Sequence, residues 1–225
     1  MHISPDHIIL WQHGVVVINA TLVFTWVVMG LLMVISILAT RRLSSEENLS
    51  RWQNLLESIV NGMAGQINDI HPGRAGRLLP FLGTLFLFIA LSNILAVVPG
   101  FIPPTGSLST TAALALCVFI AVPLYGIFQA GPIRYLKNYV RPSPLMLPFN
   151  VMGELSRTLA LAVRLFGNVM SGNMIAAILL SIAPLLVPVI MQLFGLLTGL
   201  VQAYIFSVLA AVYVAAGIEV HEKQV

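Results

Sequence analysis

The sequence predicts an all-α polytopic membrane protein with five transmembrane helices, one interfacial amphipathic helix, and a last pair of helices that are long and tilted. Of its 225 residues, 58% are hydrophobic and only 8% are charged, whereas soluble domains carry roughly a quarter charged residues. Five apolar stretches also reach the ~20 residues that a helix needs to cross a bilayer. A soluble enzyme, a disordered regulator and a nucleic-acid-binding module with a basic patch are therefore excluded.

The five predicted spans belong to one membrane domain that covers residues 1–225. They are residues 14–39, 81–98, 112–130, 150–181 and 184–217. Pro99 closes the second span, and Pro123 lies within the third, where it favours a kink. Residues 1–13 are predicted as an external segment, and residues 218–225 as a tail.

The last two spans are longer than a perpendicular crossing needs. They hold 32 and 34 residues. At ~1.5 Å per residue this gives helices of ~48–51 Å, against a hydrocarbon core of ~30 Å. Such helices tilt, kink or extend beyond the core, and a tilt is the expectation here.

Residues 44–70 have the pattern of a helix that lies on the membrane. Apolar side chains recur at helical spacing between Trp52 and Ile70, and polar ones occupy the other face. Ser44 and Glu47 form a capping box that begins the helix. A helix this polar cannot cross the bilayer, so it is predicted at the surface. A face that docks a partner subunit is the alternative.

The lysine and arginine residues predict the orientation. With five spans, nine of the eleven fall on one side of the membrane and none on the other. Because cytoplasmic loops carry the excess of Lys and Arg, the N-terminus is predicted outside and the C-terminus in the cytoplasm. The nine are Arg41, Arg42, Arg51, Arg74, Arg77, Arg134, Lys137, Arg141 and Lys223.

The two remaining arginines lie within the fourth span. Arg157 follows Glu154 by three residues, a favourable spacing on a helix, which predicts a structural salt bridge. Arg164 lies about fourteen residues, or ~21 Å, into the span, and the next acidic residue is Glu219. An ionisable residue at that depth is costly and marks a functional site by default. Its counter-charge is expected from another chain or from water.

Small residues form a stripe on each of the last two spans. The stripes are Gly153, Ala160, Gly167 and Ser171 on the face of Arg164, and Gly195, Gly199, Ala203, Ala210 and Gly217 on the last span. Small residues let another helix approach closely. The stripes therefore predict either packing of the two helices on each other or contact with a surface that slides past them.

Amide side chains occupy both faces of the fourth span. Asn168 lies one turn from Arg164 on its side, and Asn173 lies about 180° around the helix. Polar groups on both faces fit two separate aqueous paths, one on each side of the charge. An interhelical hydrogen bond is the alternative role for each amide.

Residues 161–173, LAVRLFGNVMSGN, closely resemble the signature helix of subunit a of F-type ATP synthases of the bacterial type. The resemblance extends to Ser92-Asn93 in the second span and to residues 202–206, QAYIF, in the last. It covers the chain in order from Gly14 onward.

The resemblance implies a chain that is not itself catalytic but belongs to a proton-transporting ATP synthase in the bacterial plasma membrane. It implies two half-channels that load and unload the carboxylates of a rotating c-subunit ring. Its further implied partners are peripheral-stalk b subunits, other ATP synthase subunits and the lipid bilayer. Arg164 matches the arginine that faces the ring, Gln202 the glutamine beside it, and Asn168 the asparagine one turn on. The segment 44–70 resembles the family's surface helix near the peripheral stalk.

The sequence departs from the best-known bacterial pattern at three half-channel positions. These positions carry Asn173, Gly195 and Ala96, so the outer half-channel is expected to lack a titratable relay. Sodium is therefore an alternative to the proton as the transported ion. The predicted lining residues are Asn173 and Gln192, with Glu154, Ser171 and Asn93 as further candidates.

A small secondary transporter or permease is the alternative function. Those folds usually contain internal repeats, and five spans here show none. A purely structural scaffold would leave Arg164 unexplained. We expect no catalytic residue, no cofactor and no metal, because Asp6, His7 and His13 are a weak ligand set. The polar residues at the C-terminal end, Glu219, His221 and Glu222, fit a solvated tail.

Overall fold

A computed structural model of the chain describes residues 9–13, 16–41, 51–70, 72–73, 75–98, 100–131, 146–182 and 187–222. Within these ranges the structure is almost entirely helical, and five helices are long and apolar enough to cross a membrane. The prediction of an all-α polytopic membrane protein is therefore confirmed.

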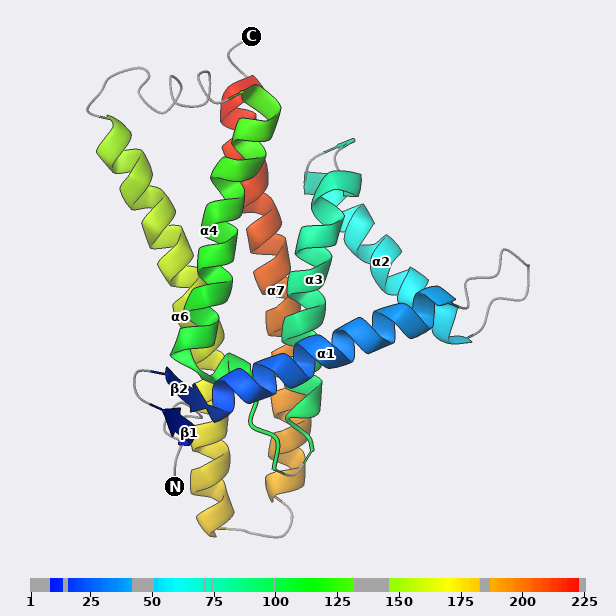
Figure 1. The fold of residues 1–225 in the computed structure, drawn as a ribbon, viewed down its shortest axis with the longest axis vertical. Helices are drawn as coiled ribbons and strands as arrows, with labels where there is room; N and C mark the ends of the chain where they lie inside the picture. The colour runs from blue at the N-terminus through cyan, green and yellow to red at the C-terminus, as the bar shows by residue number, and fades with distance from the viewer. Residues whose placement is uncertain are drawn as a thin grey trace.

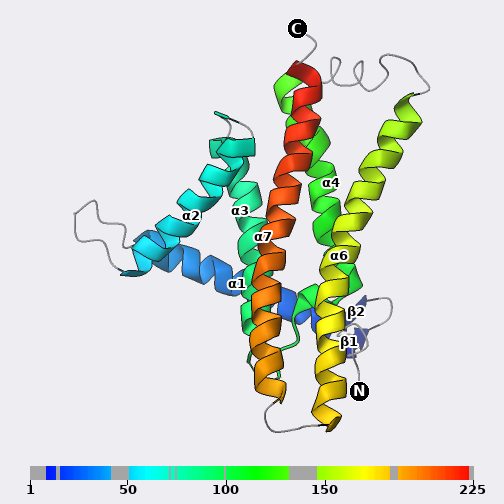
Figure 2. The same cartoon turned by 180° about the vertical axis from the view of Figure 1, so that it is seen from behind.

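Four helices form the body of the molecule (Figure 1). They are α3 (Ala75–Leu95), α4 (Leu108–Ala130), α6 (Met146–Ile182) and α7 (Val187–Glu222). Helix α7 packs against the other three, and α6 also packs against α4. The two long helices run antiparallel, side by side (Figure 2).

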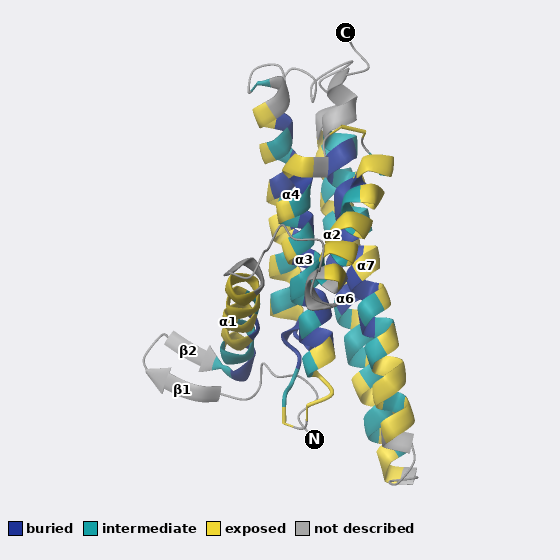
Figure 3. Cartoon of the chain, turned by 90° about the vertical axis from the view of Figure 1, so that its right-hand side faces the viewer, coloured by how far each residue is buried: buried dark blue, intermediate teal, exposed yellow. Residues whose placement is uncertain are grey.

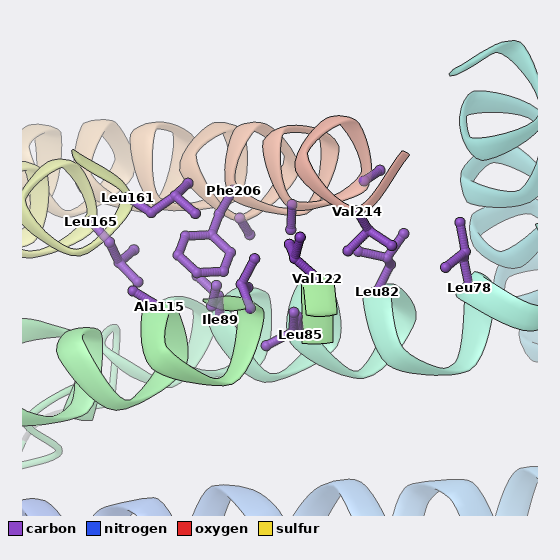
Figure 4. Packing of buried hydrophobic residues seen from close by; sticks show 14 of the residues in the cluster. Leu78, Leu82, Leu85, Ile89, Ala115, Val122, Leu161, Leu165, Phe206 and Val214 are labelled. Atoms are coloured by element: carbon purple, nitrogen blue, oxygen red, sulfur yellow. The ribbon is translucent and has the colours of Figure 1, made fainter. Parts of the chain in front are cut away.

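The core lies between these four helices, where apolar side chains from each of them meet (Figure 4). Phe206 of α7 is fully buried at its centre, with Ile89 of α3 and Leu165 of α6 also fully buried. At ~25 cal/mol per Å² of apolar surface, contacts of this kind are the main stabilising term of a fold in water. In a bilayer, close van der Waals packing carries more of that role.

The long helices are longer than predicted. Helix α6 has 37 residues and α7 has 36, which corresponds to ~55 Å each. Toward its N-terminal end, α6 leans away from α4 and α7 (Figure 1). The predicted break between them falls near residues 183–186, which lie outside the described ranges.

The first predicted span starts too early. Helix α1 begins at Ala20, not Gly14, and ends at Arg41. Strand β2 (Val16–Asn19) precedes it and pairs antiparallel with β1 (Ile9–His13). The run of valine and isoleucine in β2 explains the difference, because β-branched side chains favour strands over helices.

Helix α1 crosses the bundle instead of running along it (Figure 1), so that a side view of the bundle shows α1 nearly end-on (Figure 3). Its contact with the bundle is limited. Val28 is fully buried, and the ring of Phe24 packs edge-on against Phe101 with centroids 4.9 Å apart. Other apolar side chains are open, among them Trp26 at 62% and Met33 at 66% exposed. Surface of this kind suits lipid or another subunit.

Helix α2 (Arg51–Ile70) forms the predicted amphipathic helix, and it packs on α3 and α7. Residues 42–50, which include the predicted cap at Ser44 and Glu47, lie outside the described ranges. Ile67 enters the core with 3% of its surface exposed. The hydroxyl of Tyr204 in α7 donates to Gln66 Oε1 at 2.6 Å. The apolar face of α2 thus contacts this chain itself.

The second half of the connection between α3 and α4, residues 103–107, is buried, whereas Ala96, Val97, Val98 and Gly100 are exposed. Helix α3 begins before the predicted span and includes Pro80, and it ends at Leu95, short of the predicted residue 98. The residue before a proline disfavours the helical region, which explains why turns replace the helix ahead of Pro99. A short 3-10 helix, η2 (Pro104–Gly106), then leads to Ser107 at the N-cap of α4, and all four residues are buried.

Candidate functional site

Arg164 lies in the middle of α6 on a face that no described part of the chain covers. Leu161 and Leu165 are buried against the bundle, whereas Val163 and Arg164 are exposed. Arg164 makes no hydrogen bond, ion pair or ring contact with any described residue. Its charge is therefore free to act on something outside this chain.

The small-residue stripe of α6 shares that open face. Ala160, Gly167 and Ser171 are exposed, and Gly153 is half-buried. A Cβ atom added at Gly153 or Gly167 would meet nothing within 4 Å. At Gly153 and Gly167 the stripe has open space around it, so the surface near Arg164 is smooth and unoccupied by the described chain, whereas Ser171 lies farther along and faces a cavity beside α7.

The stripe of α7 faces inward from Gly199 onward, whereas Gly195 is exposed. A Cβ at Gly199 would lie 2.8 Å from Asn93 Cβ in α3, and one at Gly217 would lie 2.7 Å from Val122 Cγ1 in α4. Ala203 and Ala210 are fully buried. The interpretation of this second stripe as a sliding surface is therefore wrong. Gly199 lets α7 approach α3, and Gly217 lets it approach α4.

A cavity of about 170 Å³ opens between α6, α7, the end of α3 and the loop before η2. It brings together the predicted residues Asn93, Asn168, Ser171, Asn173 and Gln192, and also Ala96 and Gly195. None of the described residues that line it has an ionisable side chain. Most of its lining surface is apolar, and amide and hydroxyl groups supply its polarity; it is called the polar cavity below.

Asn93 holds the inner wall of the cavity together. Its Nδ2 donates to the Gly199 carbonyl at 3.0 Å, and its Oδ1 accepts from the Thr105 hydroxyl at 3.1 Å. Asn93 is 5% exposed and Thr105 is fully buried. This chain of bonds ties α3, η2 and α7 to one another. Sequence reasoning found Asn93 but missed Thr105 and the contact at Gly199.

Asn168 shows how α6 and α7 are aligned along their axes. Its Nδ2 lies 3.5 Å from the Thr198 carbonyl, at the limit of a hydrogen bond. Arg164 lies one turn before Asn168, and Gln202 lies one turn after Thr198. Because the two helices are antiparallel, Arg164 and Gln202 lie at about the same level, ~6 Å along the axis from the Asn168 contact.

Gln202 is buried, with 6% of its surface exposed. Its Nε2 has no hydrogen-bond partner among the described residues. An unpaired buried amide donor destabilises the folded state by roughly 1–3 kcal/mol. The Gln202 amide, at about the level of Arg164 along the helix axes, is therefore expected to bind a partner such as water. Buried polar groups that are not satisfied by protein are often satisfied by ordered water.

Asn173 and Arg164 lie on different faces of α6, as the spacing predicts. Asn173 lines the cavity, and Arg164 does not. A Cβ added at Gly106 of η2 would lie 3.7 Å from Asn173 Nδ2, so the buried loop approaches this side chain closely. Ser171 donates its hydroxyl to the Asn168 carbonyl at 3.2 Å.

Glu154 does not line the cavity, and it is half-buried farther toward the start of α6. Arg157 has a contact that sequence reasoning missed. Its guanidinium carbon lies 5.7 Å from the centroid of the Tyr213 ring in α7, within the range of a cation–π interaction. The two arginines of α6 therefore differ, because only Arg157 has a partner of this kind in the described chain.

Some predicted residues cannot be placed. Asp6 and His7 lie outside the described ranges, as do the side chains of His13, Glu219, His221 and Glu222. Within the described part of the chain, no group of three His, Cys, Asp or Glu residues is arranged to hold a metal ion.

Comparison with known proteins finds relatives over nearly the whole chain. The family profile described as ATP synthase A chain matches residues 22–215. The chain is 60% identical over 222 residues to ATP synthase subunit a 2 of Acaryochloris marina, covering 99% of this chain and 95% of that protein. It is 59% identical over 223 residues to ATP synthase subunit a 1 of Chlorobaculum parvum, covering 99% of each chain.

ATP synthase subunit a of Nitrosospira multiformis is a further relative, 58% identical over 216 residues, or 96% of this chain and 86% of that protein. The match covers the helices that carry Arg164, the polar cavity and Gln202. The chain therefore belongs to the ATP synthase A chain family.

Proposed function

We propose that this chain is the ion-translocating stator subunit of the ATP synthase membrane sector, with Arg164 as the residue that acts on the c-subunit ring. One observation carries the proposal. An exposed, unpaired arginine lies mid-helix on a smooth face of α6, while a polar cavity begins one turn farther along at Asn168 and extends to Asn173 on another face of the same helix.

The cavity serves as the outer half-channel. An ion enters between α6 and α7, passes Asn173 and Gln192, and reaches Asn168, one turn from Arg164. There it neutralises a ring carboxylate that then leaves into the lipid. The positive charge of Arg164 lowers the pKa of a carboxylate that approaches it, so the ion is released on the other side. Because a guanidinium stays charged, it also blocks an ion from crossing directly.

The ring lies against the exposed face of α6, where Ala160 and Gly167 allow its helices to pass closely. The excess of Lys and Arg on one side supports an orientation with the start of α6 and the end of α7 on the cytoplasmic side. The cavity, at the opposite ends of these helices, then opens outside. Peripheral-stalk b subunits are the further partners, beside the surface helix α2.

The transported ion follows from the cavity and the ring together. Since no described lining residue is ionisable, a proton crosses by way of water and amides, and the same lining would pass sodium. The carboxylates of the ring then select the ion. The dependence of ATP-driven transport on sodium concentration in vesicles decides between the two.

Replacement of Arg164 tests the proposal. Arg164→Ala is expected to abolish both ATP synthesis under an imposed gradient and ATP-driven pumping, because ring carboxylates are no longer discharged. Arg164→Lys is also expected to fail, since a flexible ammonium is deprotonated more readily and lacks the planar fork. Both are measured in vesicles, with complex content determined on native gels.

Arg157→Ala is the matched control. It removes a cation from the same helix, but one that packs on Tyr213, so it is expected to lower stability by about 0.5–2 kcal/mol and leave coupled transport intact. Near-normal ATP synthesis by an assembled Arg164→Ala complex would contradict the proposal. A loss of complex assembly in Arg164→Ala would indicate that Arg164 has a structural role.

A further inference from the structure

A second cavity lies between α2, α3 and α7, apart from the polar cavity. Its volume is about 260 Å³. Its walls are mostly apolar and include Ile59 and Met63 of α2, Phe86 of α3, and Val208 of α7. It shares no lining residue with the polar cavity.

Three of the four polar side chains at this cavity are engaged with one another or with backbone, and the fourth, Ser58, lies at its exposed edge. Tyr204 donates to Gln66 Oε1 at 2.6 Å, and the buried Ser207 donates to the Leu82 carbonyl at 3.2 Å. A polar ligand would therefore give up hydration without gaining matched partners, which costs free energy. An apolar occupant has no such cost.

The size and position of the cavity favour a chain-like apolar occupant. An apolar cavity of about 150 Å³ can bind benzene and stays free of water, and this one is larger. It lies between an amphipathic helix of interfacial pattern and two membrane-spanning helices. A site of this kind lies next to the part of the hydrocarbon core just beneath the headgroups, where lipid chains are the most abundant apolar groups.

We propose that this cavity binds one acyl chain of a membrane phospholipid. The chain fills the space beneath α2 and contacts α7 between Tyr204 and Ala211. This stretch begins two residues after Gln202, so the bound chain supports α7 on the side away from the polar cavity. The phospholipid headgroup stays at the membrane surface beside α2.

Photocrosslinking of the intact complex tests the site. The wild-type ATP synthase is reconstituted in vesicles that contain a phospholipid with a diazirine in the middle of one acyl chain. Mass spectrometry of the subunit is expected to find crosslinks on Met63, Phe86 or Val208. A matched lipid with the diazirine on its headgroup is expected to leave these residues unlabelled.

Two glycines of α2 supply a matched pair of variants. Gly62 lines the cavity and Gly65 does not, and a Cβ at either would meet nothing within 4 Å. Gly62→Phe is expected to fill the cavity and reduce acyl-chain labelling of Phe86 and Val208 to background, whereas Gly65→Phe keeps it.

Two wild-type results would overturn the proposal whatever the variants do. The first is an absence of acyl-chain labelling in the cavity while the exposed Met33 of α1 is labelled. The second is a crosslink from the cavity residues to another subunit, which would make the occupant a protein. Equal labelling of the Gly62→Phe and wild-type complexes, at equal complex content, would also overturn it.

Discussion

At Gly199 a missing side chain sets how close two helices come. A Cβ at Gly199 would lie only 2.9 Å from the amide carbon of Asn93, whose Nδ2 donates to the Gly199 carbonyl at 3.0 Å. Only glycine allows this bond together with the present spacing of α3 and α7. The wall of the polar cavity depends on that contact, since both residues line it.

Gly199→Ala is therefore expected to destabilise the complex by about 1–3 kcal/mol, the usual effect of overpacking. Gly195→Ala is the matched control in the same helix, because its Cβ would meet nothing within 4 Å. It is expected to be neutral or slightly stabilising, as alanine favours a helix over glycine. Thermal unfolding of the purified complex measures both. Equal stability of the two variants would show that the Asn93 contact does not limit the spacing.

Replacement of Gln202 is expected to affect stability and function in different ways. Its buried Nε2 has no partner among the described residues, so Gln202→Met, which removes the donor at similar volume, is expected to leave stability unchanged or raise it by up to about 1–3 kcal/mol. Coupled transport is expected to fall, because the amide no longer holds water near the level of Arg164. Thermal unfolding and ATP synthesis are measured on the same preparation. A clear loss of stability would assign Gln202 to packing instead.

The helices differ in how far the sequence could predict them. The five spans and the amphipathic helix follow from hydropathy and a period of 3.6 residues, which are local properties. The strand at Val16–Asn19 was missed because an apolar run of β-branched residues satisfies both patterns. The bond from Asn93 to Gly199 joins residues 106 positions apart, and only the packed helices reveal it.

The site was predictable to a similar degree. Depth in an apolar span singled out Arg164, and helical spacing placed Asn173 on another face. The inward direction of the α7 stripe could not be predicted, because a row of small residues has the same pattern whichever helix it packs against. The roles of Thr105 and Tyr213 depend on partners in other helices and carry no signal in the sequence alone.

Helix α2 offers a test of attachment at the scale of an element. Ile67→Glu puts a charge among core residues that leave only 3% of Ile67 exposed. It is expected to destabilise the fold by several kcal/mol, of the order of an unpaired buried charge, and to detach α2 from α7. Asn61→Glu, on the exposed side of the same helix, is expected to change little. Protease sensitivity of α2 itself measures detachment, and equal sensitivity of the two variants would contradict the packing described here.

The whole molecule combines an inward-packed set of helices with large apolar outer surfaces. Helix α1 leaves most of its described side chains open, and α6 exposes Leu159 at 67% and Ile178 at 61%. A monomeric soluble protein rarely shows apolar surface on this scale. A membrane subunit covers it with lipid and with other subunits of the ATP synthase, of which this family is a part.

The central claim is that the polar cavity leads from the outside of the membrane toward Arg164. It is tested most directly by the sidedness of a cysteine at Asn173, in a chain whose exposed native cysteine is first removed by Cys117→Ser. Asn173→Cys is expected to react with a membrane-impermeant thiol reagent added outside, and not with one added on the cytoplasmic side. Leu165→Cys, at a fully buried position, is expected to stay inert from both. Reaction of Asn173→Cys from the cytoplasmic side alone, or from neither side, would contradict the claim.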